Sequence, residues 1–552
     1  MSSIAFWNAR KKRKKNPMIC FELKSPNELV FTLKNLKSNP AFKPYKSVGV
    51  RKYLIKTSQL QEIVSICDRK KWEVVPFPDE VQKALDKEKL WPFNEKFKKT
   101  GLYRLMFEYQ REGLRHAVTH FNGRCLIGDE MGLGKTLQAI AIMKYYRGVD
   151  KMERVLIVCP AYLRHNWKQE FNKWMPFLKP VLIEKGNQSL EGWPLIISYD
   201  LASVKADELK KLKIEMVICD ESHYLKSHKT KRTKALTPVV KAAKRAVFLT
   251  GTPALNRPSE LYSQAHMLYP KTFPSFRKYA VRYCNAQMSP LGFFDTSGMS
   301  NNYELKWLCR KMFMIRRTKD SVLKDLPEKV RSEIYLDVKA KDLKPLKPGM
   351  KEWKELNYNI TQMEPCSDEI KSASFRRKCL ISELFRLTSV AKTAIVCKVV
   401  NDLAESGVPF LVFCYHKELM TRLENTLSNY SYFRIDGNTP TAKRQEMVNK
   451  FQDGQYQVAI LSLLAASTGI TLTRASMVVF AEMYWTPGVM LQAEDRVHRI
   501  GQKNACDIKY LITRGTLDEY LFKKLNSKLS TLDNILDGRN DRSLGGEQFE
   551  LR

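Results

Sequence analysis

Short, continuous apolar runs recur along most of the chain and alternate with longer segments of helical pattern. A strand that is apolar on both faces is typical of a parallel sheet covered by helices on both sides. The runs fall into two sets, separated by a Lys-rich, mostly helical stretch at roughly residues 327–396. The first set contains Val155–Cys159, Leu195–Ser198, Met216–Asp220 and Ala246–Thr250, and the second contains Phe410–Cys414, Tyr432–Asp436, Val458–Ser462, Val478–Glu482 and Ile508–Ile512. We therefore predict an α/β protein with two parallel-sheet lobes.

The first part of the chain has a different pattern. From Met18 to about Lys87 the segments are short and alternating, which favours strands with one exposed face. The expected strands are Ile19–Lys24, Leu29–Leu33 and Lys52–Thr57, with a helix or turn at Asn35–Phe42 and a helix at Ser58–Lys70. We predict a small N-terminal α+β module with many exposed Lys and Arg side chains. It either binds a polyanion or is a structural appendage with an ordinary solvated face.

Composition indicates the kind of partner. The 552 residues include 94 Lys and Arg against 58 Asp and Glu, a net charge of +36 that suits binding to a polyanion. No apolar run reaches the ~18 residues that a membrane span needs, so we expect no membrane partner. The twelve Cys are scattered without a CxxC pair, which argues against a zinc site.

A basic cluster, Arg10–Lys15, lies within the first 17 residues, which we expect to be disordered in isolation. Three interpretations stay open: a nuclear import signal, a phosphate-binding arm, or a solvated tail. On the first interpretation the protein is nuclear.

The strongest chemical motif is a phosphate loop. Its residues, Asp129, Glu130, Met131, Gly132, Leu133, Gly134, Lys135 and Thr136, precede a segment of helical pattern. The two glycines would let the backbone approach phosphate, and the helix N-terminus would point its amides at the anion. Lys135 is expected to reach the β and γ phosphates of ATP and Thr136 to ligate Mg²⁺. Because the strict motif has Gly where Asp129 stands, an ordinary glycine turn is the alternative.

Two acids follow directly on an apolar run. Asp220 and Glu221 come after Met216–Cys219, at the edge of a parallel sheet where nucleotide crevices form. Asp220 is suited to hold Mg²⁺ through its water shell, and Glu221 to orient and deprotonate the attacking water. The alternative is a solvated acidic loop.

The third element, Gln492–Gln502, belongs to the second lobe. Arg496 and Arg499 are three residues apart, and Gln492 is one turn before Arg496, so we expect one helical face to carry all three. Guanidinium groups suit the charge that develops on a γ-phosphate. A surface pair without a ligand is the alternative. With the loop and the acids in the first lobe, the site would be complete only when the lobes close.

These motifs, in this order, resemble those of Swi/Snf-type ATPases of helicase superfamily two over residues ~90 to ~535. Phe107–Gly113 resembles the family's adenine-reading glutamine motif, which implies that Gln110 contacts adenine. The loop that begins at Asp129 and the sequence DESH after Cys219 are the family's forms of the first two motifs. Further resemblances are Cys159–Trp174 and Ile197–Asp200 to DNA-contacting segments, Leu249–Pro253 to an interlobe coupling motif, Arg316–Lys329 to the lobe junction, and Gln492–Gln502 to the final motif.

Within that family the resemblance is greatest to the HARP-type annealing helicases. Leu387–Val396, Leu411–Met420 and Ala465–Leu472 look like that branch, and the N-terminal module falls where the branch keeps its HARP domain. No acidic and apolar helix at the N-terminus resembles the branch's tether for the single-strand-binding replication protein A. A single-strand-binding protein is therefore a possible partner, but we identify no segment that would bind it.

The resemblance implies two RecA-like lobes with helical protrusions, and an ATPase with ATP and Mg²⁺ that translocates on double-stranded DNA. Fork or bubble structures would be its substrates, and it would rewind their strands. We expect a monomer. A nucleosome-remodelling ATPase is the alternative with the same machinery, and a non-catalytic DNA-binding scaffold is the alternative of another class.

The resemblance and the patterns together divide the chain into six parts. They are a basic tail (1–17), a HARP-like module (18–90), a first, ATP-binding lobe (91–330), a linker and helical protrusion (331–396), a second lobe (397–535) and a C-terminal tail (536–552).

Overall fold

The computed structural model describes residues 18–551 except 26–27, 35–41, 43–44, 50–51, 57–58, 75–80, 82–83, 85–89, 254–256, 290–292, 364–366, 465–469, 537–543 and 545–546. The predicted basic tail, most of Asn35–Phe42 and most of Ala465–Leu472 therefore lie outside the described residues.

Lobe one is built on a seven-stranded sheet in the order β14-β6-β11-β10-β7-β9-β8, and every neighbouring pair is parallel. The strands are β6 Arg124–Ile127, β7 Val155–Cys159, β8 Val181–Ile183, β9 Leu195–Ser198, β10 Met216–Asp220, β11 Arg245–Leu249 and β14 Met314–Ile315. Central strands such as β7 and β11 are buried along their whole length because helices cover both faces. These helices include α5 Glu108–Thr119, α6 Lys135–Asp150 and α7 Arg164–Trp174 on one face, and α8 Tyr199–Val204, α9 Ala206–Lys211, α10 Lys231–Ala242, α11 Ser259–Leu268, α12 Phe276–Tyr283 and α13 Asn302–Met312 on the other.

Lobe two repeats the plan with a second parallel sheet, in the order β17-β18-β16-β19-β20-β15-β21. Its strands are β15 Lys329–Leu336, β16 Phe410–Cys414, β17 Tyr432–Ile435, β18 Val458–Ser462, β19 Met477–Phe480, β20 Cys506–Thr513 and β21 Glu547–Leu551. Its helices include α18 Lys417–Thr426, α19 Thr441–Gln452, α20 Pro487–Glu494 and α21 Leu517–Leu536. The predicted α/β class with two parallel-sheet lobes is confirmed.

The boundaries around lobe two differ from the predicted ones. Residues after 330 were expected to begin a linker, yet β15 Lys329–Leu336 pairs with β20 inside the sheet of lobe two. The segment expected as a C-terminal tail contributes β21, which pairs with β15. In the sheet order β15 lies between β20 and β21, and β21 is the edge strand. The first three residues of β15 are exposed or half-buried, so this strand lacks the continuous apolar run that marks a central strand.

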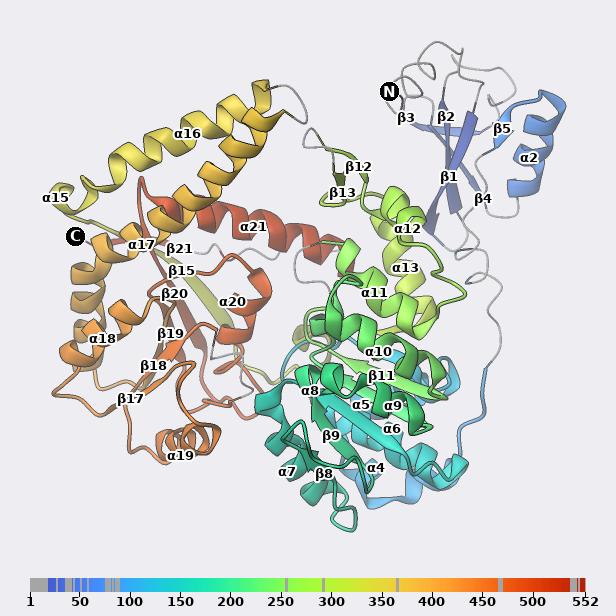
Figure 1. The fold of residues 1–552 in the computed structure, drawn as a ribbon, viewed down its shortest axis with the longest axis horizontal. Coiled ribbons are helices and arrows are strands. Elements are labelled where there is room, and N and C mark those ends of the chain that lie inside the picture. The colour runs from blue at the N-terminus through green and yellow to red at the C-terminus, as the bar shows by residue number, and fades with distance from the viewer. Residues whose placement is uncertain are drawn as a thin grey trace.

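The helical protrusion is a hairpin of two long helices, α16 Leu346–Gln362 and α17 Asp368–Glu405 (Figure 1). The helix α17 crosses the predicted boundary at residue 396 and enters lobe two, where its last turns are buried. Of the helices that the structure describes, none is long and apolar enough to cross a membrane.

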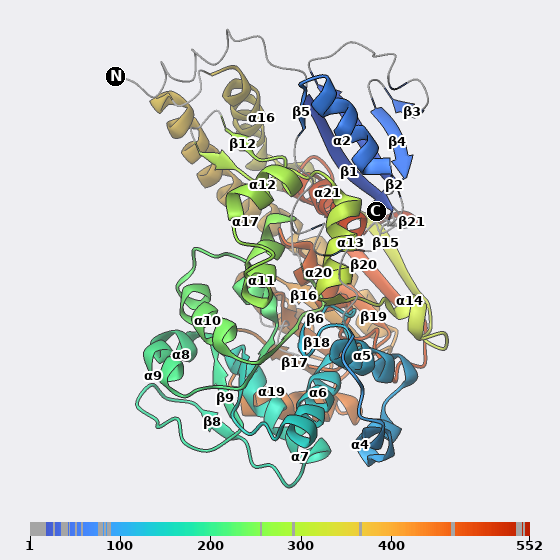
Figure 2. The ribbon, with the colours of Figure 1, turned by 90° about the vertical axis from the view of Figure 1, so that its right-hand side faces the viewer.

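The N-terminal module is the predicted α+β unit. Its sheet has the order β3-β4-β2-β1-β5, and the helix α2 Leu60–Arg69 lies among the described residues of the module. The strands are β1 Met18–Ser25, β2 Glu28–Lys34, β3 Lys46–Gly49, β4 Lys52–Lys56 and β5 Glu73–Val74. Strand β1 lies beside α13 of lobe one (Figure 2). The module's apolar core is continuous with that of lobe one, and Arg282 of α12 donates a hydrogen bond to the Phe21 carbonyl of β1 at 2.9 Å. The module is therefore packed against lobe one.

Candidate nucleotide site between the lobes

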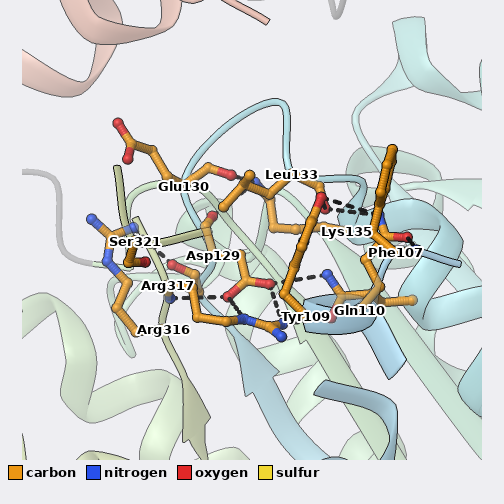
Figure 3. Close-up of polar contacts among 12 residues, drawn as sticks. Phe107, Tyr109, Gln110, Asp129, Glu130, Leu133, Lys135, Arg316, Arg317 and Ser321 are labelled. Carbon is orange, nitrogen blue, oxygen red and sulfur yellow. Dashed lines mark hydrogen bonds and ion pairs between the residues drawn. The ribbon is translucent and has the colours of Figure 1, made fainter. Parts of the chain in front are cut away.

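The phosphate loop connects β6 to α6. Gly132 and Gly134 have φ of 82° and 69°, a region that favours glycine. An added Cβ at Gly134 would collide with the Gln110 side chain, and one at Gly132 would lie 3.2 Å from Cγ of Arg499. Lys135 begins α6, and its Nζ donates to the carbonyls of Asp129 and Glu130 at 2.9 and 3.1 Å (Figure 3). The loop thus holds its ammonium group beside the backbone that a phosphate would approach.

The two predicted acids lie where β10 ends. Asp220 accepts hydrogen bonds on both carboxylate oxygens, from the Trp167 indole and from the Glu221 amide, each at 2.8 Å. Glu221 has a left-handed backbone with φ of 48°, and its Oε2 lies 3.2 Å from Nδ1 of His223. The strand end therefore places the two carboxylates side by side, with Asp220 held by two hydrogen-bond donors and Glu221 close to the His223 ring.

Electrostatics tie these acids to the lysine. Burial and the neighbouring Glu221 raise the pKa of Asp220 to about 6. Burial opposes ionisation of Glu221 as well, but His223 and Lys135 lower its pKa below the usual range. Burial lowers the pKa of Lys135, and Glu221 opposes that change most strongly. Within lobe one, two adjacent carboxylates therefore interact with one ammonium group.

This donor set fits Mg²⁺. Hard oxygen ligands beside phosphate are what the ion prefers in proteins, and it keeps several of its waters there. Asp220 would hold it through water, and the Thr136 hydroxyl in the first turn of α6 would be its second protein ligand. The structure thus brings both predicted magnesium residues to one end of the lobe-one sheet.

The two arginines approach the phosphate loop and Glu221 from lobe two, but the expectation that one helical face carries them is wrong. Helix α20 ends at Glu494, so only Gln492 lies on it, buried at 5% exposure. Arg496 and Arg499 lie in the turns that follow. The helix stops where Glu494 and Asp495 are held by cations of the lobe junction.

Arg496 and Arg499 nevertheless face the acids of lobe one. Arg496 is 2% exposed and donates to the Ile470 carbonyl at 3.1 Å. Burial and the neighbouring Arg499 lower its pKa to about 9, and Glu221 is among the groups that oppose this. Arg499 donates to the Asp495 carbonyl at 2.7 Å and packs against Gly132 of the phosphate loop. Cations of lobe two and anions of lobe one therefore share one buried environment.

Gln110, the predicted adenine contact, lies on α5 beside the loop. Its amide nitrogen donates to the Leu133 carbonyl at 3.2 Å and to the Tyr109 hydroxyl at 3.3 Å (Figure 3). Its amide oxygen accepts from the Phe107 amide at 3.1 Å, which caps the helix. The exposed Phe107 ring stacks on Tyr109, with ring centroids 5.9 Å apart.

Asp129 has a role that sequence reasoning missed. Its carboxylate is fully buried and forms a two-pronged ion pair with the Arg317 guanidinium, at 3.0 and 2.5 Å, and also accepts from Gln138. Its side chain therefore anchors the loop to the lobe junction, while its carbonyl receives Lys135. The signal was present as the unusual acid in the loop and the double arginine at the junction, but nothing in their spacing paired them.

The contacts of Lys319, a second residue of the lobe junction, were not predicted from the sequence either. Its amide donates to the Glu130 carboxylate at 2.8 Å. Its Nζ lies 2.7 Å from the Asp495 carboxylate and also donates to the His498 carbonyl. Lys319 thus joins the phosphate loop to the turn that carries the arginines.

Two known domain families match the parts of the chain that carry these residues. Residues 109–383 match the SNF2-related domain and residues 391–501 match the helicase conserved C-terminal domain. The chain contains an SNF2-related helicase core. The phosphate loop and the acid pair lie in the first of these domains, and Arg496 and Arg499 lie in the second. The predicted resemblance to the Swi/Snf-type ATPases is confirmed.

The relatives of this SNF2-related core are longer proteins. A Xenopus tropicalis protein, the SWI/SNF-related matrix-associated actin-dependent regulator of chromatin subfamily A-like protein 1, is 40% identical over 438 residues, which are 77% of this chain and 44% of that protein. The DNA annealing helicase and endonuclease ZRANB3 of Mus musculus is 39% identical over 454 residues, 79% of this chain and 41% of that protein. The chain thus spans less than half the length of these two relatives. Among solved structures, the Sulfolobus solfataricus SWI2/SNF2 ATPase core in complex with dsDNA is 24% identical with a TM-score of 0.38, covering 82% of this chain and 96% of that one.

Proposed function

We propose that this chain is a DNA-stimulated ATPase that translocates on double-stranded DNA and rewinds or remodels forks and other branched DNA. The observation that carries the proposal is that residues of both lobes meet at the phosphate loop and the acid pair. Arg499 packs against Gly132 of the phosphate loop, and Glu221 is electrostatically coupled to both arginines. A nucleotide bound there would be held from two sides.

In the proposed reaction the chain's own groups divide the work. Lys135 and the loop amides bind the phosphates of ATP, and Gln110 contacts the adenine. Glu221 orients the attacking water and accepts its proton, while Arg496 and Arg499 stabilise the charge that develops on the transferred group. Magnesium, when bound, offsets the charge of the β and γ phosphates.

The step from ATPase to DNA motor rests on charge and on the relatives. The net charge of +36 favours a polyanion, and one relative is named as a DNA annealing helicase. Because the catalytic groups are divided between two lobes, hydrolysis is coupled to lobe movement. We propose a nuclear, monomeric protein on the same grounds, with the N-terminal module selecting the DNA structure.

Replacing Lys135 with Ala tests the catalytic part. The variant should lose ATP hydrolysis, because the loop then lacks the ammonium that its carbonyls hold, and should keep its affinity for duplex DNA. Lys144→Ala, further along the same helix, is the matched control and should keep both. Full ATPase activity in the Lys135 variant would end the proposal.

The choice of DNA substrate needs a comparison of stimulation. We expect forked DNA to stimulate ATP hydrolysis more than plain duplex of equal length, and nucleosomes to add nothing beyond their DNA. Stronger stimulation by nucleosomes would favour the remodelling alternative, and ATP turnover of any kind dismisses the non-catalytic scaffold.

The role of the N-terminal module has its own test. Lys46, Lys52 and Lys56 are exposed on β3 and β4, on the side of the sheet away from β1. A plot of log affinity against log salt concentration has a negative slope. If the three lysines contact phosphates, changing all three to Gln should make this slope shallower by up to about 0.9 for each lost contact. An unchanged slope would show that these lysines do not contact DNA and would favour a buttressing role.

A further inference from the structure

Trp167 connects a helix of lobe one to the acid that is proposed to hold magnesium. It lies on α7, is completely buried, and donates its indole N–H to Oδ2 of Asp220 at 2.8 Å. The opposite side of α7 is exposed and carries His165, Asn166 and Lys168. Position 167 therefore brings a helix with one solvent-facing side into direct contact with the Asp220 carboxylate.

The second tryptophan of α7 shows that this contact is not a general property of the helix. Trp174 is only half-buried, and its indole donates to Glu170 of the same helix at 2.7 Å. That bond is a local one, four residues along the helix. The bond from Trp167 spans 53 residues and joins two different elements, α7 and the end of β10.

The chemistry of the two groups suits a positioning role. The indole N–H is a donor only, so it can hold a carboxylate oxygen without competing for a metal. The other oxygen of Asp220 accepts from the Glu221 amide, so the two donors together fix the plane of the carboxylate. Partners of this kind orient metal-binding carboxylates and affect metal affinity by about 10–100-fold when they are removed.

We propose that Trp167 is a positioning residue for the magnesium acid, and that α7 through this one hydrogen bond determines how strongly the site binds Mg²⁺ together with nucleotide. The inference rests on the proposed function, because it requires that Asp220 holds Mg²⁺. The Tyr199 hydroxyl holds the backbone of the same residue, donating to the Asp220 carbonyl at 2.7 Å. The backbone position is thus secured independently, and Trp167 controls the side chain.

The test removes the N–H and keeps the shape. In the 552-residue chain, Trp167 is replaced by 3-benzothienylalanine, whose sulfur takes the place of the N–H, and separately by phenylalanine (W167F). Binding of a fluorescent N-methylanthraniloyl ADP is measured with Mg²⁺ and with chelator, in the absence of DNA. W174F is the control, because it loses a similar indole bond on the same helix.

In the wild type, Mg²⁺ should tighten ADP binding. In the benzothienyl variant this enhancement should fall about tenfold, the low end for such partners, while affinity in chelator stays within twofold. The Mg²⁺ concentration that gives half-maximal ATPase should rise by a similar factor with kcat at saturating Mg²⁺ largely kept. W174F should match the wild type in every measurement.

A benzothienyl variant that is folded and keeps the full Mg²⁺ enhancement would overturn the inference. If W167F unfolds the protein, the benzothienyl variant alone decides, since it preserves the packing. Failure of the proposed function is distinguishable, because in that case the wild type itself would show neither Mg²⁺ enhancement nor ATP turnover.

Discussion

The buried ion pair between Lys319 and Asp495 allows a quantitative prediction about the joint between the lobes. Lys319, in α14 Lys319–Val322, is 2% exposed, and its Nζ lies 2.7 Å from Oδ1 of Asp495, which is 3% exposed. Lys319→Met keeps the length of the side chain but leaves the Asp495 carboxylate buried without its main partner. Lys329 remains 4.0 Å away and offers partial compensation.

Removing one partner of such a pair costs about 3–5 kcal/mol, because an uncompensated charge stays buried. The remaining contact with Lys329 places the expected loss of unfolding free energy at the low end, about 3 kcal/mol. Asp495→Asn should cost a similar amount, since it strands the Lys319 ammonium. The double variant removes both charges, so its loss should be smaller than the sum of the single losses by at least about 1.5 kcal/mol.

Urea unfolding at pH 7, followed by circular dichroism, measures these free energies. Lys523→Met breaks an exposed pair with Glu519 in the same lobe and should cost no more than about 0.5 kcal/mol. The Lys319 variant should also lose ATPase activity, since Asp495 begins the turn that places Arg496 and Arg499. Additive single losses in the double variant would refute the reasoning.

Two further predictions concern neighbouring ion pairs. Arg317→Lys should weaken binding of fluorescent ADP about tenfold, because an ammonium cannot reproduce the two-pronged contact with Asp129 that anchors the loop; unchanged affinity would contradict this role. Burial opposes ionisation of Glu494, but Arg331 holds its pKa well below the usual range. Because the pKa of Glu494 is lower in the folded than in the unfolded protein, its ionised carboxylate stabilises the fold fully above about pH 5. This stabilisation is lost as the pH falls from there toward the folded pKa. The difference in unfolding free energy between the wild type and E494Q should thus be constant from pH 8 to 5 and shrink below about pH 4; a constant difference down to pH 3 would contradict it.

Local residue order was enough for the central architecture and for the lobe-one chemistry. Apolar runs such as Val155–Cys159 and Phe410–Cys414 became strands with the expected bounds, because a strand buried on both faces must be apolar throughout. The loop glycines and the acids after Met216–Cys219 lie where their motifs predicted them. Their function depends on neighbours within a few residues, so the sequence carries the information directly.

Long-range partners depended on the assembled lobes. Asp129 and Arg317 are 188 residues apart, and Trp167 and Asp220 are 53 apart, yet each pair forms a short polar contact. Spacing also wrongly placed Arg496 and Arg499 on a helix, and the strands β15 and β21 were assigned to a linker and a tail. Hydrophobic periodicity predicts which faces of an element are buried, but it does not predict which charged side chains form ion pairs. Those pairs form between groups that packing buries together, because a buried charge without a partner is costly. The sequence by itself therefore determined the two sheets and the phosphate loop with its acids, and only the tertiary structure decided how the junction and α7 hold them in place.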